Sequence, residues 1–360
     1  MAVGNPTLFE QATEIVQVIR VANGPDVHGA TLEPVEEVTC PAVSRVGLVL
    51  GGGGITGASY HLAALLAINM ATGWHPNDAE VIVGTSAGSF VASTVRAGDL
   101  SIDSIVRPHE GREQVAERIR NQIYQRQRPG GVVRWVHRGL LPGLRKPGVT
   151  MLLGTPALHH AGGIADWVEE QTGEMANSWP DRATVIVAYD IAGGVRVAFG
   201  TEDAPDVALK DAVAASSAVP VIFSPYEIDK RYYVDGGVVS GTHADLLLGN
   251  ADPLDLVLVL APMAADEPRT GAHFYEGLFD RVGRTALNDE LQTIGAAWPD
   301  TDILVLRPSP MVLEAMRPNP MEPAAAVPTF VRTLASLRNM LARPDVWNLL
   351  DRHLNMHTHR

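Results

Sequence analysis

Cysteine and long apolar runs are the features that this sequence has least of. Its 360 residues contain one cysteine, Cys40, which excludes an internal disulfide framework and a cysteine-based zinc site. No stretch reaches the roughly 18 to 20 apolar residues needed to cross a bilayer. The N-terminus also lacks the basic start and apolar run of a signal peptide. We therefore expect a soluble, cytoplasmic protein that could still contact a membrane peripherally.

Positive charge is also scarce. The chain has 28 Lys and Arg against 41 Asp and Glu, a net charge of −13, which argues against a nucleic-acid partner. One segment, residues 118–146, departs from this pattern because it has basic residues and no acidic ones. Its basic residues are Arg118, Arg120, Arg126, Arg128, Arg134, Arg138, Arg145 and Lys146. The segment is interpreted either as a solvated face that neutralises acidic neighbours or as a lid that contacts anionic lipid.

Strands, tight turns and helices alternate in the first half of the chain. A buried strand is predicted over Val46–Leu50, followed by glycines and a helix over Ala58–Met70. A second strand over Val81–Val83 leads through another glycine turn into a helix over Phe90–Val95. This repeated order is typical of an α/β domain.

The remaining pattern indicates one large domain with an extension at each end. Further strands are predicted over Thr184–Ala188, Val195–Phe199, Tyr232–Val234, Leu256–Leu260 and Ile303–Leu306, with a helix over Val207–Ala215 and helices from Thr329 onward. The expected organisation is an N-terminal extension (1–44), a domain (45–345) with a motif-bearing core (46–248) and a helical insertion (about 100–180), and a C-terminal helical tail (346–360).

A G-x-S-x-G motif provides the first candidate for catalysis. Ser86 lies at the centre of Gly84–Gly88, between a predicted strand and a predicted helix. In such a nucleophile elbow the flanking residues must be small, and the serine hydroxyl is exposed at a helix N-terminus. An inert serine in a glycine-rich turn is the alternative interpretation.

Gly51–Gly57 forms a glycine-rich loop between the first strand and the first helix. Its amides could bind a phosphate, since Gly52, Gly54 and Gly57 match G-x-G-x-x-G. However, no acidic residue ends a second strand about 20 residues later, and the Walker lysine is absent. A preformed oxyanion hole for acyl transfer is the favoured interpretation because of the serine motif downstream.

A nucleophilic serine needs a base. Asp235 ends a predicted strand and is followed by two glycines that let the chain turn around its carboxylate. A partly desolvated carboxylate can act as a general base, although an aspartate in a turn is often only a cap. His243 is the alternative base, in a triad with Ser86 and an aspartate.

Taken together, the motifs resemble those of the patatin-like phospholipases, in order and in rough spacing. The resemblance covers about Val46 to Leu248. It is carried by Gly51–Gly57, Gly84–Gly88, Ala215–Pro220, Phe223–Pro225 and Tyr233–Val238. It implies a three-layer α/β/α fold with a mostly parallel central sheet, a helical insertion, and hydrolysis of lipid acyl esters without metal or cofactor.

By the same resemblance, Ser86 is the nucleophile and Asp235 its partner in a dyad without histidine. The amides of Gly52, Gly53 and Gly54 would form the oxyanion hole. The supporting glycines would be Gly57, Gly84, Gly88, Gly236 and Gly237. The family usually has Arg or Lys where this chain has Thr56, so this loop lacks that positive charge. The other functions considered are a triad esterase, a catalytically weak scaffold with the same fold, and a nucleotide-binding protein.

Overall fold

The computed structural model describes residues 44–100, 107, 109–126, 157–265, 274–316 and 319–354, except for the side chains of 274–282. Most of the predicted N-terminal extension and most of the basic segment lie outside these ranges. Residues 355–360 of the predicted C-terminal tail lie outside them too. The domain limits proposed above therefore stay a prediction.

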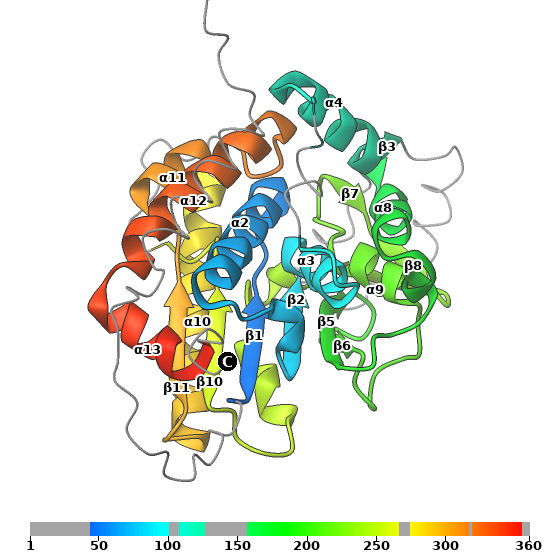
Figure 1. The fold of residues 1–360 in the computed structure, drawn as a ribbon. Coiled ribbons are helices and arrows are strands. Elements are labelled where there is room, and N and C mark those ends of the chain that lie inside the picture. Colours follow the sequence, from blue (N-terminus) through cyan, green and yellow to red (C-terminus); the bar gives the residue numbers. More distant parts are fainter. Residues whose placement is uncertain are drawn as a thin grey trace, which may run out of the picture.

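An eight-stranded mixed sheet forms the centre of the protein (Figure 1). Its strands are β1 (Val46–Leu50), β2 (Val81–Thr85), β5 (Ala183–Asp190), β6 (Val195–Phe199), β8 (Tyr226–Ile228), β9 (Arg231–Asp235), β10 (Leu256–Leu260) and β11 (Asp302–Leu306). The order is β11-β10-β1-β2-β5-β9-β8, and β6 pairs with β5 off this path. Neighbours from β11 to β5 are parallel, whereas β6 and β9 run antiparallel to β5. A separate small sheet joins β3 (Gln125–Arg126), β4 (His159–His160) and β7 (Phe223–Ser224).

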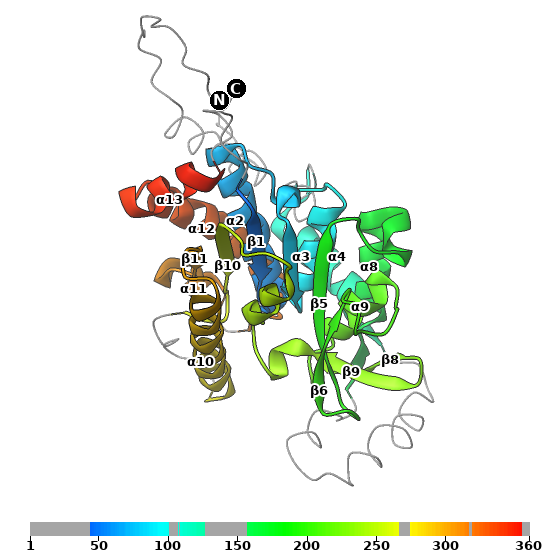
Figure 2. The same cartoon turned by 90° about the horizontal axis from the view of Figure 1, so that it is seen from below.

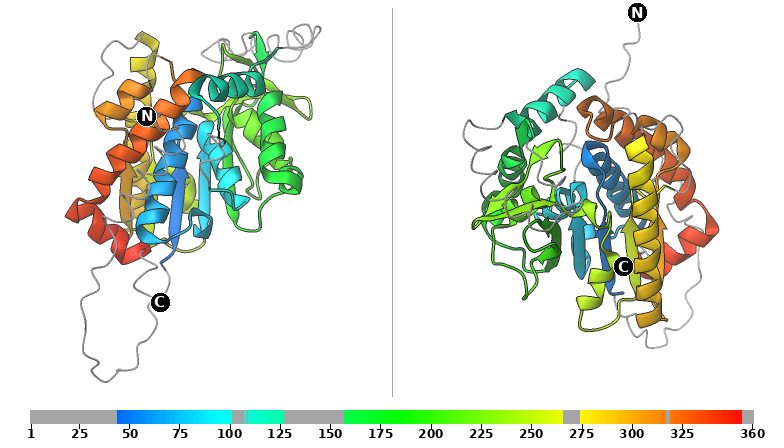
Figure 3. Two further views of the ribbon diagram at one scale, coloured as in Figure 1. Left: turned by 45° about the horizontal axis from the view of Figure 1, so that its top comes forward. Right: turned by 180° about the vertical axis from the view of Figure 1, so that it is seen from behind.

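Helices cover both faces of the main sheet. The α-helices are α2 (Gly54–Thr72), α3 (Ala87–Arg96), α4 (Arg112–Ile123), α8 (Gly162–Thr172), α9 (Leu209–Ser216), α10 (Phe274–Ala297), α11 (Pro310–Ala315), α12 (Ala326–Leu341) and α13 (Pro344–Leu354). Short 3₁₀ turns are η1 (Pro76–Asp78), η4 (Gly173–Asn177), η5 (Gly236–Val238), η6 (Ala244–Gly249) and η7 (Pro323–Ala325). Seen from below, α10 lies on the opposite side of the sheet from α2 and α3 (Figure 2). The right panel of Figure 3 shows the protein from behind, with α10 in front of the sheet.

Alternation along the strands explains the two helical layers. On β1, Leu48 and Leu50 pack with α2, α3, α9 and α12 on one face, whereas Val49 packs with η6 and α10 on the other. The same division holds on β10, where leucines and valines alternate. Strands that are buried on both faces read as continuous apolar runs, because parallel sheets are covered on both sides. The predicted three-layer α/β/α arrangement with a mostly parallel sheet is confirmed.

The predicted insertion contributes α4 and α8 to the described structure. On α4, Arg118 pairs with Glu110 at 2.9 Å, and Arg120 lies 3.6 Å from Glu322. These two contacts fit the interpretation of a patch that neutralises acidic neighbours. The five basic residues from Arg128 to Lys146 lie outside the described ranges. Among the residues that are described, no helix has both the length and the apolar content to cross a bilayer.

Candidate active site

Ser86 lies at a sharp turn between β2 and α3. Its backbone has φ 53° and ψ −122°, a left-handed conformation that is costly for a non-glycine residue, by roughly 1–3 kcal/mol. The turn is crowded on both sides. A Cβ at Gly88 would lie 1.9 Å from the Leu50 carbonyl oxygen, and a Cβ at Gly84 would lie 2.8 Å from the Gly88 carbonyl oxygen. Both glycines of the motif are therefore required by close packing.

Two serines at the end of α9 hold this turn in place. The Ser216 hydroxyl accepts a hydrogen bond from the Ser86 amide at 2.9 Å and donates one to the Val187 carbonyl at 2.6 Å. The Ser217 hydroxyl donates to the Ser86 carbonyl at 3.3 Å. These hydrogen bonds satisfy the backbone amide and carbonyl of Ser86 and connect the strained turn to β5.

The register of the sheet brings Asp235 to the level of Ser86. Thr85 pairs with Val187, and the next residue of β5, Ala188, pairs with Asp235. The Ser86 side chain lies close enough to the Asp235 carboxylate to lower the pKa of that carboxyl. The Gly237 amide donates a hydrogen bond to Asp235 Oδ1 at 2.7 Å.

Burial controls the basicity of Asp235, which is only 5% exposed. Desolvation raises its pKa to about 6, and the Ser86 side chain and the Gly237 amide oppose this shift. The carboxylate is therefore ionised at neutral pH but much more basic than a solvated aspartate. Those are the properties that a general base requires.

The amides of the glycine loop differ in whether they have a hydrogen-bond partner. The Gly52 amide donates to the Gly241 carbonyl at 2.7 Å, and its membership of the oxyanion hole stays a prediction. In the described part of the chain, the amides of Gly53 and Gly54 have no hydrogen-bond partner. Gly54 lines the same pocket as Ser86. The Gly54 amide thus remains a free donor in the pocket that Ser86 lines.

Neighbouring groups fix the loop from behind. His61 on α2 is fully buried, and its Nε2 lies 2.6 Å from the Gly51 carbonyl oxygen. Burial lowers the pKa of His61 to about 4, so the neutral ring donates this hydrogen bond. The Gly57 amide donates to the Gly53 carbonyl at 2.8 Å. Thr56, at the position where the family usually has a basic residue, is fully buried and donates its amide to the Pro320 carbonyl at 3.0 Å.

An apolar pocket, partly open to solvent, lies beside Ser86. Its walls are apolar side chains from α2, α3, α4 and α8 and from two loops. They are Ile55, Ala58, Leu62, Phe90, Ile119, Ile123, Ile164, Trp167, Val219 and Met321. The pocket provides a hydrophobic environment for a chain attached to the reacting carbonyl.

His243 occupies a different place from that expected of a triad base. Its Nε2 lies 3.1 Å from the Gly236 carbonyl oxygen, and its Nδ1 lies 3.4 Å from Arg196 Nη1. Burial lowers its pKa to about 4. Both ring nitrogens therefore face groups other than Ser86 and the Asp235 carboxylate.

One group of described residues has metal-ligand spacing. Ligand atoms of His243, Asp245 and Glu290 lie within 4.8 Å of one another. Asp245, however, is paired with Arg196, and Glu290 accepts hydrogen bonds from the protein. Protein donors already engage both carboxylates, so the cluster does not fit a metal ion.

Comparison with family models shows the family to which this chain belongs. A family model described as patatin-like phospholipase matches residues 48–248, which is more than half of the chain. The chain belongs to the patatin-like phospholipase family. The matched range contains Ser86, Asp235 and the glycine loop Gly51–Gly57, so the resemblance noted from the motifs is confirmed. The family to which the chain belongs is described as one of phospholipases.

Two solved structures are similar to this chain at low identity. VipD from Legionella pneumophila aligns with a TM-score of 0.36 and 14% identity, covering 83% of this chain and 67% of that one. Human GIVD cytosolic phospholipase A2 aligns with a TM-score of 0.42 and 11% identity, covering 98% of this chain and 64% of that one. This patatin-like chain thus spans less than two thirds of the length of the human enzyme.

Several groups around the site were missed from the sequence. Ser216 and Ser217 belong to a stretch that carried the family resemblance, but nothing in that stretch indicated that they bind the Ser86 backbone. Neither Gly241, which accepts from Gly52, nor Glu290 lies in a recognisable motif. Their roles depend on long-range register, which a local pattern does not contain.

Proposed function

We propose that this patatin-like protein hydrolyses fatty-acyl esters of lipids, with Ser86 as nucleophile and Asp235 as its only side-chain base. The observation that carries the proposal is the buried Asp235 carboxylate, which the sheet register brings to the level of Ser86, a residue that lines an apolar pocket. Nucleophile, base and a hydrophobic site for an acyl chain are thus present within one small volume.

The reaction follows from these groups. Ser86 Oγ attacks the ester carbonyl carbon as its proton passes to Asp235. The amides of Gly53 and Gly54 donate to the oxyanion of the tetrahedral intermediate. Collapse of the intermediate breaks the bond to the leaving alcohol, which takes the proton from Asp235. Water then attacks the acyl-serine, gives one proton to Asp235, and the fatty acid leaves as Ser86 recovers that proton.

The pocket supports a long acyl chain as the substrate group. Each methylene that moves from water into an apolar wall contributes roughly 0.8 kcal/mol. The walls present almost only hydrocarbon, whereas Ser59, Ser86 and Ser217 are the polar residues that line the pocket. We therefore expect activity to increase from short to medium and long acyl esters.

The triad alternative is less well supported by the geometry. His243 uses Nε2 on the Gly236 carbonyl and faces a guanidinium with Nδ1. The nucleotide-binding alternative is disfavoured because the Gly52 amide is occupied by Gly241. Labelling of Ser86 by an activity probe would distinguish an enzyme, which labels, from a catalytically weak scaffold, which does not.

The central experiment combines a fluorophosphonate probe with chromogenic acyl esters. The wild-type protein should label at Ser86 and hydrolyse the esters, and Ser86→Ala should lose both properties. Ser178→Ala, at an exposed site on the surface, is the matched control and should retain both. A folded Ser86→Ala protein with wild-type hydrolysis would overturn the proposal.

A second variant separates the dyad from a triad. Loss of a triad histidine lowers kcat by about 10⁶-fold. His243→Gln removes the imidazole but keeps an N–H that can donate to the Gly236 carbonyl. A dyad enzyme should keep kcat within about 100-fold of the wild type, since geometry alone changes. A loss near that of Ser86→Ala would instead support the triad.

We also propose that residues 118–146 bring the enzyme to anionic lipid. Ile119 and Ile123 of α4 line the pocket, while the side chain of Arg120 is 53% exposed on the same helix. Basic and apolar groups therefore occur together close to the acyl site, as at a headgroup boundary. Flotation with anionic vesicles should recover more protein than flotation with neutral ones. Equal recovery would favour a patch that serves only to neutralise acidic neighbours.

A further inference from the structure

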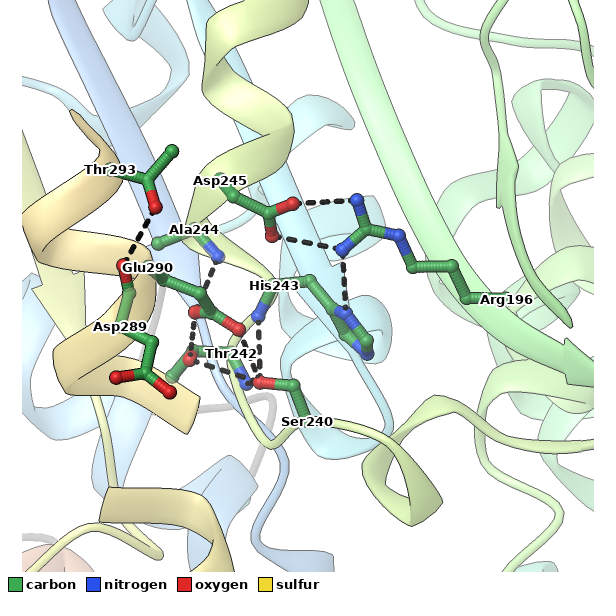
Figure 4. A network of polar contacts seen from close by, with 9 residues as sticks. All are labelled: Arg196, Ser240, Thr242, His243, Ala244, Asp245, Asp289, Glu290 and Thr293. Carbon is green, nitrogen blue, oxygen red and sulfur yellow. Dashed lines mark hydrogen bonds and ion pairs between the residues drawn. The ribbon is translucent and has the colours of Figure 1, made fainter. Parts of the chain in front are cut away.

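Glu290 on α10 is a buried carboxylate that the proposed chemistry does not use. It is 8% exposed and accepts three hydrogen bonds (Figure 4). The Ser240 hydroxyl donates to Oε1 at 2.5 Å, while the Thr242 hydroxyl and the Ala244 amide donate to Oε2 at 2.6 and 2.8 Å. Both oxygens are thus engaged by one short segment, residues 240–244.

Segment 240–244 contacts both parts of the proposed active site. Its Gly241 carbonyl accepts the hydrogen bond from the Gly52 amide, next to the two free donors of the loop. Its His243 ring contacts the carbonyl of Gly236, which directly follows Asp235. The position of this one segment therefore sets the distance between the oxyanion donors and the general base.

Arg196 on β6 supports the segment from the other side. It forms a two-pronged ion pair with Asp245, at 2.9 and 2.6 Å, and its Nη1 lies 3.4 Å from His243 Nδ1. A guanidinium can only donate, so it places the lone pair of the ring on Nδ1 and the ring proton on Nε2. That proton is directed at the Gly236 carbonyl. The same guanidinium supplies the positive charge that a metal ion would bring to this cluster.

We propose that Glu290 is a positioning residue of this hydrolase. It fixes segment 240–244, and through that segment it keeps the glycine loop and Asp235 in register with Ser86. The role rests on the proposed function, because it concerns the geometry of that same reaction. Glu290 itself touches neither the substrate nor the dyad.

The test is the kinetic effect of Glu290→Gln on hydrolysis of a medium-chain p-nitrophenyl ester. The substitution keeps the size of the side chain but replaces one acceptor oxygen with a donor, which opposes the hydroxyl or amide facing it. We expect kcat to fall about 10- to 100-fold, because small misplacements of reacting groups have effects of this size. KM should stay within about twofold, since no residue of segment 240–244 lines the pocket.

The matched control is Asp289→Asn. Asp289 is the preceding residue of α10, is exposed, and loses the same charge on substitution. Its only contact in the network is its carbonyl, which accepts from Thr293. Asp289→Asn should keep wild-type kcat and KM. Thr242→Val, which removes one donor to Glu290, gives a second and milder variant, and its effect should be non-additive with that of Glu290→Gln.

The outcomes separate this role from the function on which it rests. If wild-type protein neither hydrolyses the ester nor labels at Ser86, the proposed function fails, and the positioning role fails with it. If wild-type protein is active and folded Glu290→Gln matches Asp289→Asn in kcat, only the positioning role is overturned. If Glu290→Gln does not fold, an unchanged kcat in Thr242→Val decides against the role, and a lowered kcat at constant KM decides for it.

Discussion

Replacing Asp235 with Asn should abolish hydrolysis and at the same time stabilise the protein at neutral pH. The isosteric amide keeps an oxygen for the Gly237 amide and can still face the Ser86 hydroxyl, so packing should be preserved. What disappears is a buried negative charge. Its pKa rises from 3.8 to about 6 on folding, with desolvation as the main cause. Ionisation of this group therefore opposes folding.

The size of the effect follows from this shift. Because the folded-state pKa is the higher one, the folded protein binds the proton more tightly than the unfolded chain. Stability is full below pH 3.8 and is lost as pH rises through about 6. The loss is about 0.5 kcal/mol at pH 4, about 1.6 kcal/mol at pH 5 and about 3 kcal/mol at pH 7. Asp235→Asn removes this pH-dependent penalty.

Urea unfolding at pH 4, 5, 6, 7 and 8 measures the prediction. The free energy of unfolding of Asp235→Asn minus that of wild type should increase between pH 4 and 7 and then level off. Its pH-dependent part should approach about 3 kcal/mol. If the free energies of unfolding of the two proteins changed with pH in the same way, the Asp235 carboxylate would not be desolvated as described. If the difference instead decreased with pH, ionisation of Asp235 would stabilise the folded protein, contrary to the prediction.

Three further predictions test the same site. First, kcat/KM of the wild type should fall about tenfold from pH 7 to pH 5, since the free enzyme needs an ionised base with a pKa of about 6; a flat profile would contradict this. Second, Gly88→Ala should prevent folding or lower the melting temperature strongly, because its Cβ would lie 1.9 Å from the backbone of β1, whereas Gly249→Ala has open space and should be tolerated. Third, Ala58→Phe should lower kcat/KM for long-chain esters more than for acetate, because Ala58 lines the pocket; Ala297→Phe on exposed surface should change neither.

The regular elements were predictable because their apolar patterns are local. Val195–Phe199 and Leu256–Leu260 are strands with the predicted bounds, and the helices lie where apolar segments follow the glycine turns. Element ends were less predictable. The first helix begins at Gly54, four residues before the predicted start, because glycine has a poor helix propensity and conceals the first turn.

Contacts between distant segments could not be predicted in the same way. The sequence indicated the pair of Ser86 and Asp235 through their motifs and the resemblance to the family. It did not indicate that the Gly52 amide donates to the Gly241 carbonyl, 189 residues later. That hydrogen bond depends on where the loop after β9 lies relative to the end of β1. Glu290 was missed for a related reason, since a single carboxylate in a long helix carries no local signal.

Part of the pocket wall comes from helices that carry none of the proposed catalytic residues. The register of β2, β5 and β9 brings Ser86 and Asp235 together, and the proposed oxyanion donors belong to the glycine loop that follows β1. Much of the acyl wall, by contrast, comes from α4 and α8, which lie outside the main sheet. Reactivity and selectivity are therefore separable in this molecule. Substitutions on α4 or α8 can be screened with a series of esters that differ in acyl chain and share one chromogenic leaving group. A changed preference among these esters would then report on the pocket wall and not on the proton transfer.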